Sequence, residues 1–226
     1  MTLDRAIPPV AFVVVGGALY YAFSPACTGS DRFYGVLFGV YLVGALAAVA
    51  RMFRDGTLID LFKWRSGDLA IGVVSAVVLA LAIHGGRTVL APRGTLSDLA
   101  VARVYAQIPP LGAGGTRLLV YLGGLVVIAA LQIVTWQGLV QQAIEERLGP
   151  RRGFIVTAVL FGAAHAPTVK LLWLPAVGYN PLVLFAALFA GLVWGFLAGR
   201  LQRLAPSMVS AAVLALTLVW QFRLTQ

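Results

Sequence analysis

Seven apolar stretches follow one another along the chain, separated by shorter polar connections. Repeated apolar runs of this kind predict transmembrane helices, because a helix that spans a bilayer needs about 20 predominantly apolar residues. The predicted helices cover residues 8–23, 33–50, 68–83, 118–150, 153–166, 181–199 and 206–222. The pattern therefore predicts an all-α polytopic transmembrane helical bundle of about seven spans, without a separate soluble domain.

The polar connections divide the chain into two parts. Residues 1–117 carry helices one to three with their connecting segments, and residues 118–226 form a four-helix core. In segment 51–65 basic and apolar residues alternate, so it is either a surface helix that binds anionic lipid or a basic cytoplasmic connector. Gly56 breaks its periodicity and favours the connector. Residues 95–108 predict a short amphipathic helix on the membrane surface, and His84 is expected to cap the third helix.

Composition supports the membrane assignment. Hydrophobic residues make up 60% of the chain and charged residues only 11%, with a mean hydropathy of +0.91. A soluble domain would carry about 25% charged residues. The net charge of +9 comes from arginines at helix ends, a placement that indicates topology and lipid headgroups rather than nucleic acid. The single cysteine, Cys27, excludes an intrachain disulfide.

The distribution of Lys and Arg predicts the orientation. Ten of the 17 basic residues lie on the side that holds Arg5 and segment 51–65, and seven lie on the other. Because positive charge accumulates in cytoplasmic loops, the sequence predicts a multi-pass protein of the inner (plasma) membrane with a cytoplasmic N-terminus.

One polar pair lies inside the predicted bilayer, on either side of the Gly149-Pro150 turn. Gln132 precedes Arg147 by 15 residues, and His165 follows Gly153 by 12 residues. At 1.5 Å per residue both lie roughly 20 Å from the turn, hence at similar depth. Ionisable and polar side chains within a span usually face the bundle interior. For His165 we keep two interpretations. It is either a neutral core histidine that hydrogen-bonds across helices, with Gln132 as the candidate partner, or a site residue.

Three segments of the core resemble a known family. Segment 136–150 resembles the end of the glutamate motif of the CPBP family of intramembrane proteases, the CAAX-processing and bacteriocin-processing (ABI) proteases. Phe161-Gly-Ala-Ala-His165 fits the family's second motif, in which phenylalanine precedes histidine by four residues. Segment 191–212 resembles the penultimate helix and the start of the last one. The resemblance covers roughly residues 118–220 and implies the CPBP fold.

The same resemblance implies that most catalytic positions are substituted. In the family register the glutamate pair falls on Gln132 and Ile133, and the expected arginine falls on Gln137. The second histidine falls on Ala211 and its asparagine partner on Ala215. His165 and Gln132 are therefore the vestigial catalytic candidates. Four further positions are binding candidates of the same site: Phe161, Trp136, Gln137 and Ala211.

Carboxylates are missing from the predicted spans. All eight lie in a connection or at a helix end, and the Glu145-Glu146 pair lies beside the turn and is expected to be solvated. Hydrolysis inside a membrane needs an activated water, hence a buried carboxylate or a metal with about three protein ligands. We therefore expect no metal and no cofactor.

Three functions remain open. The favoured one is a catalytically degenerate family member, a pseudoenzyme that acts as a membrane-embedded binding or assembly factor for an apolar peptide, a lipid or a partner membrane protein. The alternative is an active CAAX-type intramembrane endopeptidase with altered site residues. A small transporter is disfavoured because no span contains a charged residue or a paired broken helix.

Overall fold

The computed structural model describes residues 3–109 and 115–221. Apart from an isolated bridge between Leu174 and Gly178, the described residues form helices and connections only. Within residues 3–109 and 115–221, six segments are long and apolar enough to cross a membrane, and α11 is a shorter apolar helix. The predicted class, an all-α transmembrane bundle, is therefore confirmed. The main helices are α1 (Leu3–Ala22), α2 (Arg32–Arg54), α4 (Asp68–Leu90), α6 (Thr116–Ile133), α8 (Pro150–Ala164), α10 (Leu182–Leu201) and α11 (Ala205–Val219).

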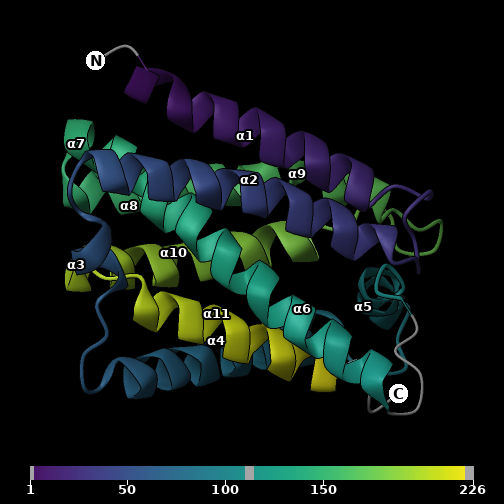
Figure 1. Ribbon diagram of the computed structural model, residues 1–226. Coiled ribbons are helices and arrows are strands. Elements are labelled where there is room, and N and C mark those ends of the chain that lie inside the picture. Colours follow the sequence, from purple (N-terminus) through teal and green to yellow (C-terminus); the bar gives the residue numbers. More distant parts are fainter. Residues whose placement is uncertain (1–2, 110–114, 222–226) are drawn as a thin grey trace.

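The long helices run roughly along one direction, and α6 crosses them diagonally (Figure 1). Helix α4 packs along α11, α8 along α10, and α1 along α2. Helix α6 contacts both α2 and α11, so it connects the first two helices with the last one. The short helices α3 (Leu58–Phe62) and α5 (Asp98–Tyr105) lie at opposite ends of the bundle (Figure 1).

Small residues allow α8 and α10 to approach closely. A Cβ atom at Gly162 would lie 2.9 Å from Leu188 Cβ, and one at Gly191 would lie 2.9 Å from Phe161 Cδ1. Close backbone approach is the usual role of glycine in transmembrane helices. At Gly123 and Gly124 on α6 a Cβ would meet no atom within 4 Å. Glycines therefore form a packing face between α8 and α10, whereas Gly123 and Gly124 of α6 face open space.

The helix expected over 118–150 is not uniformly α-helical. It contains a π-helical segment, η1 (Val134–Gln141), before continuing as α7 (Gln142–Leu148), and all eight residues of η1 are buried. Side chains enter its backbone ladder: the Thr135 hydroxyl lies 2.8 Å from the Leu131 carbonyl oxygen, and the Arg51 guanidinium donates to the Leu139 carbonyl over 3.3 Å. Such outside partners stabilise the wider turn, and π segments of this kind often occur at functional sites.

The structure differs from the prediction at the end of α4 and in the connection after α8. Helix α4 continues to Leu90, and His84 lies inside it and accepts a hydrogen bond from Gln221 on Nδ1 over 2.6 Å. Gly85 and Gly86 do not end the helix, which includes Arg87 in its last turn. After α8, the segment expected as a loop begins with a further short helix, α9 (Ala166–Leu171).

Candidate functional site

Gln132 and His165 line a common cavity. Gln132 lies in the last turn of α6, directly before the π segment, and His165 is the residue that joins α8 to α9. The cavity has a volume of about 600 Å³ and is bounded by α4, α5, α6, α8, α10 and α11. We call it the α4–α10 cavity, because exposed residues of these two helices, Leu90, Phe185 and Phe189 among them, form its mouth.

A second cavity adjoins the first. This α2–α6 cavity, of about 300 Å³, is lined by Tyr34, Leu37 and Tyr41 of α2 and by Leu125, Ile128 and Ala129 of α6, among others. Gln132, His165 and Trp194 line both cavities, and Ala211 and Ala215 line the second. Four positions of the family register therefore face one internal space: Gln132, His165, Ala211 and Ala215.

His165 is held by its own helix. Its Nδ1 lies 2.8 Å from the carbonyl oxygen of Phe161, one turn earlier. A carbonyl can only accept, so Nδ1 carries the proton, and in the neutral ring Nε2 has the lone pair. His165 Nδ1 therefore bonds to Phe161 and not to Gln132, the partner considered from the sequence. The ring is buried, with 8% of the residue exposed.

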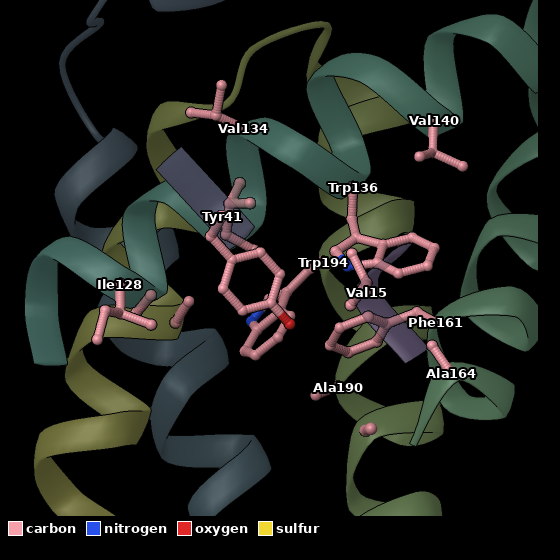
Figure 2. Close-up of a cluster of buried hydrophobic side chains, with 14 of the residues drawn as sticks. Val15, Tyr41, Ile128, Val134, Trp136, Val140, Phe161, Ala164, Ala190 and Trp194 are labelled. Atoms are coloured by element: carbon pink, nitrogen blue, oxygen red, sulfur yellow. The ribbon is translucent and has the colours of Figure 1, made fainter. Parts of the chain in front are cut away.

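Aromatic side chains hold the histidine ring in place. The Phe161 ring lies edge-on to His165 with centroids 4.9 Å apart and edge-on to Trp136 at 5.2 Å. Figure 2 shows Trp136 above Phe161, with Trp194 on the side toward Tyr41. Trp194 is fixed by α11, because its Nε1–H donates to Ser210 Oγ over 3.1 Å. Trp194 was not among the predicted site residues, although it lies in the segment that resembles the penultimate helix.

Trp136 and Gln137 have a different position from the other candidates. Both belong to η1, both are almost fully buried, and neither lines the two cavities. The Gln137 Oε1 atom has no hydrogen-bond partner within the described part of the chain. Trp136 contributes through its contact with Phe161, whereas the role of Gln137 as a binding residue stays a prediction.

No Asp or Glu belongs to the described residues that line either cavity. Glu145 is half-buried rather than solvated and accepts a hydrogen bond from Gln141 Nε2 over 2.6 Å. The same Gln141 nitrogen donates to the Gly195 carbonyl on α10 over 2.9 Å. The Glu146 carboxylate pairs with Arg51 of α2 at 2.5 Å. Glu146 thus ties α7 to α2, and Gln141, which also bonds to Glu145, ties η1 to α10.

The comparisons with known proteins identify the family of the C-terminal core. Residues 114–217 match the family model described as Rce1-like, type II CAAX prenyl endopeptidase Rce1-like. This part of the chain is an Rce1-like CAAX protease (CPBP) domain, which confirms the resemblance found in the sequence. No curated protein and no solved structure matches the chain. The match takes in α6, η1, α7, α8, α9, α10 and all of α11 except its last two residues.

Proposed function

We propose that this chain is a non-proteolytic member of the family that binds an apolar ligand in the α4–α10 cavity. In this role it is a membrane-embedded binding or assembly factor. One observation carries the proposal: the space that holds His165 contains an amide, Gln132, where the family register has a carboxylate.

The chemistry of the lining favours binding over turnover. A general base must accept a proton near neutral pH, and the Gln132 amide has no such equilibrium. Among the described residues, no group of three or more His, Cys, Asp or Glu side chains lies together to hold a metal ion. His165 is the single residue of these types on the cavity lining that the structure describes.

The form of the cavity favours an apolar ligand that arrives from the bilayer. Its volume falls within the range of about 300–1,000 Å³ that is usual for ligand sites. The mouth lies between two apolar helices, and Phe185 and Phe189 are 61% and 43% exposed beside it. A ligand can therefore enter sideways without crossing a polar surface.

The first experiment measures cleavage. Purified protein in proteoliposomes is incubated with a fluorogenic prenylated CAAX peptide, next to an active protease of the family as positive control. We expect no turnover above that of protein-free vesicles. Turnover that disappears in His165→Ala would establish the alternative, an active CAAX-type endopeptidase, and overturn the proposal.

The second experiment measures binding of the same peptide, by fluorescence anisotropy in detergent. A Cβ atom at Gly86, which lines the cavity, would meet no atom within 4 Å, and neither would one at the adjacent Gly85, which does not line it. We expect Gly86→Leu to abolish peptide binding by filling the cavity, and Gly85→Leu to leave it unchanged. Equal binding by both variants would place the ligand elsewhere.

A further inference from the structure

A small basic pocket adjoins the α4–α10 cavity at the C-terminal end of α4. It has a volume of about 320 Å³ and is lined by His84, Arg87, Thr88, Ala91 and Arg93. Arg87 lines both spaces, so the apolar cavity and the basic pocket meet at its side chain. A ligand that fills both would have an apolar chain and a polar end.

The charges of the pocket leave one net positive charge. Arg87 is buried and donates from Nη2 to Asp98 over 2.8 Å. This hydrogen bond holds the pKa of the Asp98 carboxyl below its usual value, so Asp98 is ionised at neutral pH and balances Arg87. Arg93 is exposed and adds a second guanidinium. A phosphodiester, with one negative charge, complements this arrangement.

His84 adds a donor to the pocket. Its Nδ1 accepts a hydrogen bond from the Gln221 side-chain amide, so in the neutral ring the proton is on Nε2. With the two guanidinium groups, the pocket lining therefore presents N–H donors of the kind that bind phosphate oxygens.

The length of the cavity fits one acyl chain. Its lining residues on α10 extend from Leu182 to Trp194, which is about 18 Å at 1.5 Å per residue. One leaflet of a bilayer has a hydrocarbon depth of about 15 Å, half of the usual thickness of about 30 Å. Arg87 lies in the last turn of α4, where a headgroup at the membrane surface would be.

We propose that the site binds an anionic phospholipid, with one acyl chain in the α4–α10 cavity and its phosphodiester in the basic pocket beside Arg87 and Arg93. This inference rests on the proposed function and specifies its ligand. The acyl chain enters between α4 and α10 while the headgroup stays at the interface. His165, Gln132 and Trp194 line the same cavity.

The test is native mass spectrometry of the delipidated protein, titrated separately with phosphatidylglycerol and phosphatidylcholine of the same acyl chains. We expect one retained phosphatidylglycerol per chain and at least about tenfold weaker binding of phosphatidylcholine. Arg93→Gln should weaken phosphatidylglycerol binding about tenfold, as expected for the loss of one charge-assisted hydrogen bond. Arg32→Gln is the matched control, because Arg32 is an exposed arginine outside both spaces.

The outcomes separate this inference from the proposed function. Equal binding of the two lipids, or no effect of Arg93→Gln, overturns the headgroup assignment and leaves apolar binding in the cavity intact. Phosphatidylglycerol binding that survives Gly86→Leu overturns the acyl-chain assignment. Equally tight binding of free glycerol phosphate would show a site for a soluble phosphate and overturn the lipid. Both proposals are supported if Gly86→Leu loses the binding of phosphatidylglycerol and of the peptide while Gly85→Leu keeps both.

Discussion

Buried arginines at the ends of the bundle each have a carboxylate partner from another segment. Arg51 pairs with Glu146, Arg87 with Asp98, and Arg203 with Asp68. Asp68 lies at a helix end, as expected, and is fully buried there. Its carboxylate accepts hydrogen bonds from Arg203 Nη2 over 2.8 Å and from the Arg65 backbone N–H over 2.9 Å. The pair joins the start of α4 to the connection between α10 and α11.

Breaking this buried pair should be costly. Asp68→Ala leaves the Arg203 guanidinium buried without its carboxylate, so we expect a loss of about 3–5 kcal/mol in stability. Replacing both partners, with Asp68→Leu and Arg203→Met, should cost much less because no charge is left buried. Asp60→Ala, at an exposed carboxylate, is the control and should cost under about 0.5 kcal/mol. Unfolding in mixed micelles measures all four proteins, and equal stabilities of Asp68→Ala and the control would contradict this account.

At the scale of elements, the core depends on how closely its helices approach. Helices α8 and α10 meet at Gly162 and Gly191, and this contact positions Phe161, whose ring and carbonyl hold His165. The π segment η1 places Trp136 against the same Phe161 ring. The geometry of the candidate site is therefore produced by helix packing rather than by loops.

The two kinds of glycine give a direct comparison. Gly162→Ala brings a Cβ to 2.9 Å from Leu188 Cβ and 3.2 Å from its Cα, so we expect destabilisation of about 1–3 kcal/mol from overpacking. Gly123→Ala places its Cβ in open space and should be neutral or stabilise by up to about 1 kcal/mol, because alanine favours the helix. The same unfolding measurement applies. A larger loss for Gly123→Ala than for Gly162→Ala would show that the helices do not meet in this way.

At the scale of the whole molecule, the helices alternate in direction, so the two short connecting helices α3 and α5 lie at opposite ends (Figure 1). The excess of Lys and Arg lies on the side of α3. Because such an excess is typical of the cytoplasmic side, we predict that α3 lies there and α5 on the opposite side.

Cysteine labelling tests the orientation. Asp60 on α3 and Thr95 before α5 are exposed, whereas the native Cys27 is fully buried and should not react. In intact cells a membrane-impermeant maleimide should label Thr95→Cys but not Asp60→Cys, and permeabilisation should make both accessible. The reverse pattern would invert the orientation, and equal labelling of the two in intact cells would refute the number of spans between them.

The sequence by itself determined the class, the family and most of the spans. These follow from long apolar runs and from local motifs such as Phe161-Gly-Ala-Ala-His165, and both properties are readable without tertiary contacts. The assignment of the family's glutamate pair to Gln132 and Ile133 also comes from the sequence, and it stays a prediction.

Only the tertiary structure decided which polar residues face a common space. Gln132, His165, Ala211 and Ala215 are far apart in sequence and line one cavity, whereas Gln137, five residues after Gln132, does not. The burial of this segment belongs to a π-helical turn whose Leu139 carbonyl accepts a hydrogen bond from Arg51 of α2, and no periodicity within the segment encodes a donor from another helix. The basic pocket, likewise, exists because α4 continues past His84 to Arg87, where Gln221 contacts His84 and Asp98 pairs with Arg87, and the local Gly85-Gly86 signal does not reveal these contacts.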